Sequence, residues 1–155
     1  MPAVPPPQVG IIGMRALRAD INRLADDQSS RLYQAIKDAG RQAAEPVAQR
    51  ARGAFPHGDT GDLAGDVRVS GTKTGAAVRV GRVKIPYAGW VEFGGRRHTP
   101  HESARTFVPS GRYLFPAAAG LADVAAQRYT DALERVFSDP SVWTNTTDNG
   151  GDVHD

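Results

Sequence analysis

Two histidines and an acid lie close together in the polar stretch from residue 94 to residue 112 of this 155-residue chain. His98, His101 and Glu102 carry donor atoms that Zn²⁺ and Mn²⁺ accept, so a small metal-dependent hydrolase or nuclease could use them, with Asp59 as a further ligand. Their order does not match the His-Glu-x-x-His helix of zinc hydrolases, a proline separates the histidines, and three nearby arginines would repel a cation. We therefore expect no metal here, but a loop that is mobile or ordered by a partner.

A second candidate cluster occupies the turn-rich segment from Phe55 to Leu63, where His57, Asp59 and Asp62 could approach a metal ion. A calcium loop would need more alternating acids and a bidentate glutamate at its end, which this segment lacks. Its glycines can adopt positive φ, and the side chains of Asp59 and Thr60 can bond to nearby backbone. The segment is therefore predicted to be a structural turn.

Glu92 is the one ionisable residue in the densest aromatic cluster of the chain, residues 85–95. A carboxyl among such neighbours could be buried, with a raised pKa and a catalytic role. No second acid or nucleophile lies within a few positions to complete such a site, so we expect Glu92 to face solvent or to pair with an arginine. The sequence thus predicts no catalytic residue and no cofactor.

The aromatic cluster that carries this acid can form a helix or a strand. Tyr87, Trp90 and Val91 recur at helical spacing. Pro86 suits the first turn of such a helix, and Gly94-Gly95 would end it. In a strand, alternate residues would share a face instead, and periodicity over so few residues does not exclude that arrangement. We favour the short helix.

Two N-terminal segments also show helical periodicity. Residues 13–25 repeat apolar side chains every three or four positions and predict an amphipathic helix. A second helix is predicted to start at a cap formed by Ser29 or Ser30 and to extend to Arg52. Because Pro46 cannot donate a helical hydrogen bond, we expect a kink or break in it near Ala44.

The middle of the chain predicts a β-hairpin, and a later segment predicts a long helix. Valines alternate with polar residues in 66–70 and 76–81, so one hairpin face should be buried, with Arg68 and Arg79 on the outer face. Residues 116–137 predict a helix of roughly 33 Å, the longest element. The predicted fold class is α+β, with N-terminal helices, an antiparallel hairpin or small sheet, a short central helix and a long C-terminal helix packed on the sheet.

Length and charge restrict the class of protein. A chain of 155 residues suits one domain, which we place at residues 13–137 between a proline-rich extended arm (1–12) and an acidic tail (138–155). The tail carries four aspartates and no Lys or Arg, so residues 1–137 carry a net charge of +6 within a total of +2. A basic nucleic-acid-binding module is therefore an alternative function, although the arginines are scattered and form no run of five.

The chain has no cysteine and no long apolar run. Disulfides and thiolate chemistry are therefore excluded. No segment approaches the roughly 20 apolar residues of a membrane span, and the proline-rich N-terminus lacks the basic and apolar regions of a secretory signal. We expect a protein made and used, or assembled, in the cytoplasm, with no membrane partner.

Three segments, taken in order, carry a resemblance to a known family. The matching residues are Asp59-Thr60-Gly61-Asp62-Leu63, then Tyr87-Ala88-Gly89-Trp90-Val91-Glu92-Phe93-Gly94, then Phe107-Val108-Pro109 with Leu114-Phe115-Pro116-Ala117. With these, the chain resembles the small tail-component proteins of long-tailed bacteriophages, of the lambdoid gene product ten type. The resemblance covers roughly residues 14–137. The stretch from residue 94 to residue 112 departs most from the family, because it carries an Arg-Arg-His-Thr-Pro-His insertion.

The resemblance implies an α+β structural protein of the virion, not an enzyme. Its subunits would form a ring, expected to be hexameric, in the neck that joins the DNA-filled head to the tail. The implied partners are head-closure (stopper) or adaptor proteins on one side and the tail terminator or tail tube protein on the other. DNA would pass through the channel without sequence-specific binding, and the protein would be assembled in the host cytoplasm.

Subunits in such a ring make heterologous contacts, so each needs two different surface patches. We expect one patch on the aromatic segment and the loop that follows it, and the other on the hairpin and the N-terminal arm. The predicted interface residues are Tyr87, Trp90, Glu92, Phe93, Arg96 and Arg97 for the first patch and Arg68 and Arg79 for the second. Apart from these patches, the residues of the turn that matches the family motif are Asp59, Thr60, Gly61 and Leu63.

Overall fold

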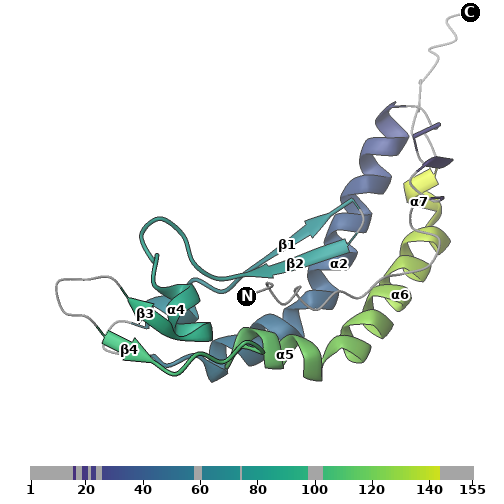
Figure 1. Cartoon of the computed structure of the whole chain (residues 1–155). Helices are drawn as coiled ribbons and strands as arrows, with labels where there is room; N and C mark the ends of the chain where they lie inside the picture. The colour runs from purple at the N-terminus through teal and green to yellow at the C-terminus, as the bar shows by residue number, and fades with distance from the viewer. Residues whose placement is uncertain are drawn as a thin grey trace, which may run out of the picture.

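The computed structural model describes residues 16, 19, 20, 22, 23, 26–57, 61–73, 75–97 and 103–143. The helices are α2 (Asp26–Ala54), α3 (Asp62–Gly65), α4 (Ala88–Phe93), α5 (Leu114–Gly120), α6 (Ala122–Ser138) and α7 (Pro140–Trp143). The strands are β1 (Arg68–Thr72), β2 (Gly75–Arg79), β3 (Gly95–Arg97) and β4 (Ser103–Arg105). Figure 1 shows a curved ribbon in which α2 contacts both the β1–β2 hairpin and α6.

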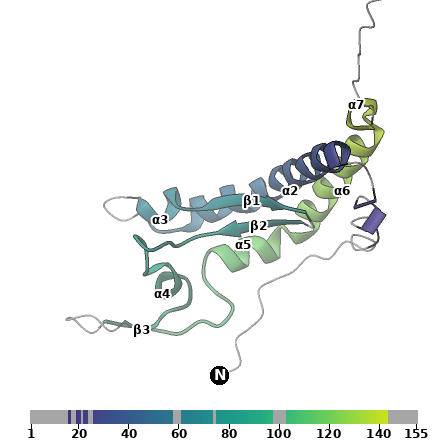
Figure 2. The ribbon, with the colours of Figure 1, turned by 90° about the horizontal axis from the view of Figure 1, so that it is seen from above.

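The hairpin of β1 and β2 lies directly against α2, as the view in Figure 2 shows. Its strands are antiparallel, with Thr72 paired with Gly75, which confirms the predicted hairpin. A Cβ atom on Gly71 would overlap the backbone of Lys37, and one on Gly40 would lie 2.6 Å from the carbonyl oxygen of Gly75. Glycine at positions 40 and 71 therefore allows strand backbone to approach helix backbone this closely.

A first core cluster fills the space between the N-terminal half of α2 and α6. Its buried residues are Leu32, Tyr33, Ile36, Ala39, Ala43, Tyr129, Ala132 and Leu133. Val142 of α7 packs against the same cluster. The Tyr129 hydroxyl has no hydrogen-bond partner within the described ranges, and burial raises its pKa. The cluster holds α6 along α2.

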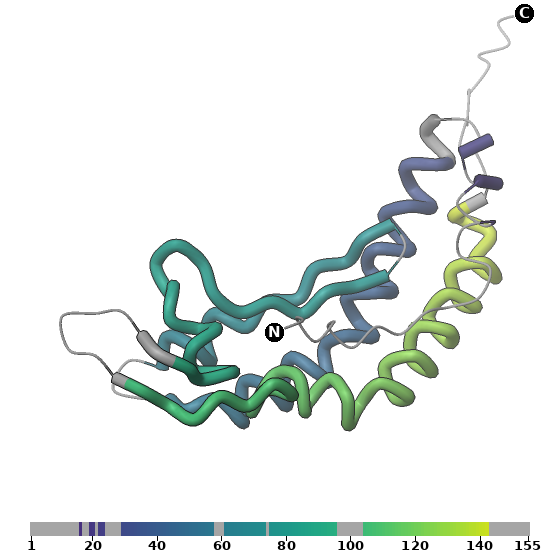
Figure 3. Tube along the Cα trace, in the orientation of Figure 1, coloured from purple at the N-terminus to yellow at the C-terminus, as the bar shows by residue number. Residues whose placement is uncertain are grey.

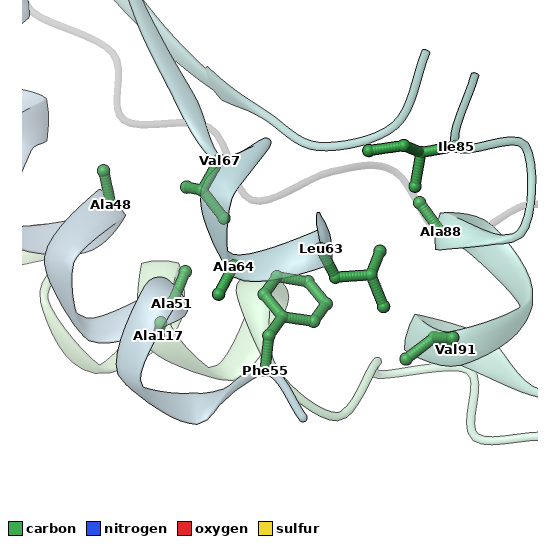
Figure 4. Close-up of a cluster of buried hydrophobic side chains, with 10 residues drawn as sticks. All are labelled: Ala48, Ala51, Phe55, Leu63, Ala64, Val67, Ile85, Ala88, Val91 and Ala117. Atoms are coloured by element: carbon green, nitrogen blue, oxygen red, sulfur yellow. The ribbon is translucent and has the colours of Figure 1, made fainter. Parts of the chain in front are cut away.

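A second core cluster lies at the other end of α2 and is drawn in Figure 4. Phe55 lies at its centre, between side chains from α3, α4 and α5. The buried members are Ala48, Ala51, Phe55, Leu63, Ala64, Val67, Ile85, Ala88, Val91 and Ala117. Helices α2, α3, α4 and α5 and the residues just before β1 and α4 therefore depend on this cluster for their relative position.

The second predicted helix, α2, is longer than the prediction. It begins before Ser29 and Ser30, which therefore lie inside the helix and not at its N-cap. It also continues through Pro46, so the predicted break is wrong, although the tube in Figure 3 bends along this helix. Proline removes one backbone hydrogen bond, and burial of the next two residues, Val47 and Ala48, stabilises the helix beyond it.

The predicted single helix over residues 116–137 is wrong, because the chain forms α5 and α6 with a break at Leu121, where φ is −118° and ψ is 10°. Gly120 is a poor helix former, and the break lets α5 reach the second cluster while α6 packs on the first. The predicted α+β class is confirmed. The long helix that packs on the hairpin is α2, which is also the longest described element.

The aromatic segment forms the predicted short helix, α4, so the strand alternative is wrong. Tyr87 is its N-cap, and Gly94, with a φ of 83°, ends it. The stretch that follows is not a plain loop, because β3 pairs with β4 in a second antiparallel hairpin, with Gly95 opposite Arg105. The two strands occupy residues 95–97 and 103–105 of the predicted loop.

Some predictions lie outside the described residues. The helix expected over 13–25 is described only at five separate positions, and the arm (1–12) and most of the tail (138–155) are not described. The first part of that tail, residues 140–143, forms α7. Among the described helices, none is long and apolar enough to cross a membrane.

Candidate subunit interface

Glu92 is 2% exposed, and its carboxylate accepts hydrogen bonds from the backbone of the loop that leads into α5. The N–H groups of Leu114 and Phe115 each donate over 3.1 Å, and those of Arg112 and Tyr113 donate over 3.2 Å. The first N–H groups of a helix lack partners within the helix, and an acid that accepts them stabilises its start. The prediction that Glu92 faces solvent or pairs with an arginine is therefore wrong.

Gly111 makes room for this arrangement. Its φ is 74°, and a Cβ atom there would overlap the Glu92 carboxylate and lie 3.0 Å from Cβ of Phe115. A side chain at this position would be strained both by the backbone conformation and by contact with the acid. Glycine therefore lets the loop close around the buried carboxylate.

Arg105 lies between the rings of Trp90 and Tyr113. Its guanidinium carbon is 5.8 Å from the centre of the Trp90 ring and 5.9 Å from that of Tyr113, distances at which cation–π attraction operates. It also donates over 2.9 Å to the carbonyl of Val91 and over 2.9 Å to the Tyr113 hydroxyl. The Trp90 indole N–H donates over 3.0 Å to the carbonyl of Gly95. These contacts join α4, β4 and the start of α5.

The aromatic residues predicted for the first patch make packing contacts within the chain. Tyr87 and Trp90 are half-buried and pack on the second core cluster. Phe93 packs edge-on against Phe115, with ring centres 5.0 Å apart. Phe107, which was not predicted for the interface, is 50% exposed. Arg96 and Arg97, the remaining predicted members of this patch, belong to β3.

Asp66 is a buried acid that the sequence analysis missed, and its side chain is 1% exposed. It accepts a hydrogen bond from the Gly81 N–H over 2.7 Å and another from Nε of Arg82, and Nε of Arg68 lies 3.5 Å away. Burial raises the pKa of this carboxyl, but these hydrogen bonds and the two arginine charges outweigh burial and lower the pKa overall. Asp66, which precedes β1, is therefore linked by hydrogen bonds to the segment that follows β2.

Arg68 and Arg79 are directly opposite each other in the hairpin, and both are exposed, as predicted for the outer face. Arg68 also donates over 2.9 Å to the carbonyl of Gly81. Arg82 and Lys84, which follow the hairpin, are exposed as well. We call Arg68, Arg79, Arg82 and Lys84 the basic face. Residues 67–101 carry seven Lys or Arg residues and one acid, the buried Glu92, while Asp66 offsets part of the charge of Arg68 and Arg82.

The turn with the family motif is described only in part. Gly61 has a φ of 67° and donates over 2.6 Å to the carbonyl of His57, and Leu63 is buried. Asp59 and Thr60 lie outside the described residues. Positive φ at Gly61 agrees with the predicted structural turn.

His98, His101 and Glu102 lie outside the described residues. Within the described ranges, no three His, Cys, Asp or Glu side chains are close enough together to hold a metal ion. The described residues include two buried acids, Asp66 and Glu92. Each accepts hydrogen bonds from donors of its own chain.

Asp66, Arg105 and Gly111 are the important residues that sequence reasoning missed. Each has a partner that is distant along the chain, as in Gly81–Asp66, Arg105–Val91 and Gly111–Glu92. The positive charge without nearby acids after residue 66 was a visible signal for the basic face. Comparisons of the chain with family models, curated proteins and solved structures find no match.

Proposed function

We propose that this protein is a structural component of the neck of a long-tailed bacteriophage, where its subunits form a ring that joins the head to the tail. The observation that carries the proposal is the position of the three segments with the family resemblance. All three contribute to the second core cluster, through Leu63, Val91 and Ala117. Residues that carry the resemblance are therefore also residues that specify one packed unit.

Contacts between these segments give individual residues of the matching motifs specific structural roles. Gly94 lies where a Cβ atom would overlap the carbonyl of Thr106, so a side chain would not fit. The N–H of Val108 donates over 2.7 Å to the carbonyl of Phe93. Glu92 accepts the N–H groups at the start of α5, including that of Leu114. The residues that carry the resemblance thus contact one another, which supports the proposal.

The proposed ring is hexameric and surrounds the DNA channel. Its partners are head-closure or adaptor proteins on one side and the tail terminator or tail tube protein on the other. The proposed location is the neck of the virion, after assembly in the host cytoplasm. DNA passes through without sequence-specific binding, because phosphate contacts by scattered arginines carry no sequence information.

Electron microscopy of particles made when this gene carries an early nonsense codon in its parent phage tests the proposal. We expect separate DNA-filled heads and finished tails, which join when the purified protein is added. Intact virions from the mutant would overturn the neck role.

The basic face supports a second candidate function, sequence-independent binding of duplex DNA. Each phosphate contact releases condensed counterions, so the affinity should fall steeply as salt rises. Replacing Arg79 with Ala should make the negative slope of log K against log salt less steep by about 0.9. Arg128→Ala, at an exposed position on α6, is the matched control. An affinity that does not change with salt would exclude this function.

A further inference from the structure

The segment between β2 and α4 ends in a tight turn with an exposed apolar tip. The N–H of Ile85 donates over 2.8 Å to the carbonyl of Arg82, which closes the turn. Val83 at its tip is 96% exposed, and the neighbouring Lys84 is also exposed. We call residues 82–85 the knob. Val83, between two cations in the sequence, is therefore not stabilised by burial against its own chain.

The knob is held at both ends. Arg82 bonds through Nε to the buried carboxylate of Asp66, and Ile85 is buried in the second core cluster. An element that is already fixed in one conformation loses little conformational entropy when it binds. The knob is therefore suited to insertion into a complementary surface.

A groove with matching features lies between α2, α6 and α7, with a volume of about 340 Å³. Its apolar lining consists of small and branched side chains, namely Ala35, Ala39, Ala132, Val136 and Val142. Such a lining can accept a valine side chain but offers no acceptor for a cation. The cations need acceptors at the edge of the groove.

Two carboxylates and one cation also line the groove, Asp38, Asp139 and Arg135. Hydrogen bonds from the hydroxyl and the N–H of Ser141 lower the pKa of Asp139, so it is charged at neutral pH. Arg135 donates through Nε to the carbonyl of Asp131 on its own helix. The charged groups of the groove are therefore acidic on balance, opposite in sign to the knob.

We propose that the knob of one copy of this chain inserts into the groove of a second copy, with Val83 on the apolar lining and Lys84 near Asp38 or Asp139. The segment between β2 and α4 and the helix α7 lie at opposite ends of the ribbon in Figure 1, so the two surfaces of one chain face different neighbours. Such a contact is head-to-tail and generates a ring or a filament. The inference rests on the ring of the proposed function and names one contact that builds it.

Two variants separate the surfaces. Val83→Asp places a charge at the tip of the knob, and Ala35→Arg fills the groove while keeping a good helix former in α2. Analytical ultracentrifugation of the full chain should show concentration-dependent species larger than a dimer for the unmodified protein. Each variant alone should be monomeric, with a dissociation constant raised at least about thirtyfold, the scale of a central interface residue. Circular dichroism checks that both variants fold.

Mixing the two variants gives the sharpest readout. The Ala35→Arg chain keeps its knob and the Val83→Asp chain keeps its groove, so the mixture should form a one-to-one dimer that cannot grow. Val124 is also exposed but lies on α6, outside the knob and the groove. Val124→Asp should therefore leave assembly unchanged. The proposal is overturned if the unmodified protein stays monomeric, if Val83→Asp assembles normally, or if the mixture yields no dimer.

The outcomes separate this contact from the neck role. Intact virions from the nonsense mutant, together with assembly in solution that depends on Val83, would keep the contact and remove the neck role. Unjoined heads and tails, together with normal assembly of Val83→Asp, would keep the neck role and remove the contact.

Discussion

The carboxylate of Glu92 and the backbone N–H of Phe115 lie 3.1 Å apart, and this hydrogen bond joins α4 to the first turn of α5. Three further N–H groups from residues 112–114 donate to the same carboxylate. Hydrogen bonds to an ionised acceptor are about twice as strong as neutral ones. The position of the aromatic helix relative to the C-terminal helices therefore depends on one buried acid.

Replacing Glu92 with Gln should lower the free energy of unfolding by about 2 to 3 kcal/mol, because a charged acceptor of several N–H groups is replaced by an amide whose NH₂ cannot accept any. Urea unfolding followed by circular dichroism measures the change. Glu134→Gln, at an exposed position on α6, is the matched control and should change stability little. Equal stability of the two variants would contradict the capping role.

Replacing Gly111 with Ala should cost about 1 to 3 kcal/mol, because the backbone there has positive φ and the new Cβ would overlap Glu92. Gly120→Ala offers a comparison within the same region, since no atom lies within 4 Å of its added Cβ. That change should be neutral or stabilising by about 0.5 kcal/mol. Thermal unfolding of both variants checks the prediction, and similar melting temperatures would refute it.

Asp66 should make stability depend on acid pH. Its pKa is lowered in the folded protein from the ordinary 3.8, so the unfolded chain binds the proton more readily. Its contribution is therefore complete above the unfolded pKa and is lost as pH falls through the folded pKa. The difference in unfolding free energy between the unmodified protein and Asp66→Asn should stay constant from neutral pH to about pH 5 and then shrink toward pH 2. Urea titrations at several pH values measure it.

Asp123→Asn is the control for this pH dependence, because Asp123 is exposed on α6. Its difference from the unmodified protein should be small at every pH. A difference for Asp66→Asn that grows as the solution becomes more acidic would have the wrong sign and would exclude the proposed network.

Replacing Trp90 with Ala should cost about 3 kcal/mol, the lower end for large-to-small aromatic changes, since the ring is half-buried. Trp90→Phe keeps most of the packing and loses the hydrogen bond to Gly95, so about 1 kcal/mol is expected. Guanidinium unfolding compares the two. An unchanged fold with lost assembly for Trp90→Ala would instead identify Trp90 as an interface residue.

Local patterns in the sequence predicted the elements that depend on neighbours in the chain. Tyr87, Trp90 and Val91 at helical spacing, followed by two glycines, predicted α4 because spacing and termination agreed. Alternating valines predicted the β1–β2 hairpin, and the exposure of Arg68 and Arg79 followed from the same alternation. For these elements the side-chain pattern and the backbone preference point to one structure.

The remaining features depend on contacts between distant segments. Nothing near Glu92 in sequence indicates that the N–H groups of residues 112–115 will surround it. The sequence therefore could not predict whether Glu92 is buried or exposed. The break at Leu121 interrupts an apolar pattern that is continuous in sequence, because α5 and α6 pack on different clusters. Helix α2 survives Pro46 because burial on both sides outweighs one lost hydrogen bond.

Pro46 also affects where α2 can bend. The first core cluster ends at Ala43 on α2 and the second begins at Ala48, so the proline lies between two separately packed halves. The helix is the long connection between them, and one of its internal hydrogen bonds is missing at this point. A helix that lacks one of these bonds bends more readily, so we expect changes in the curvature of α2 to occur here while each cluster keeps its own packing.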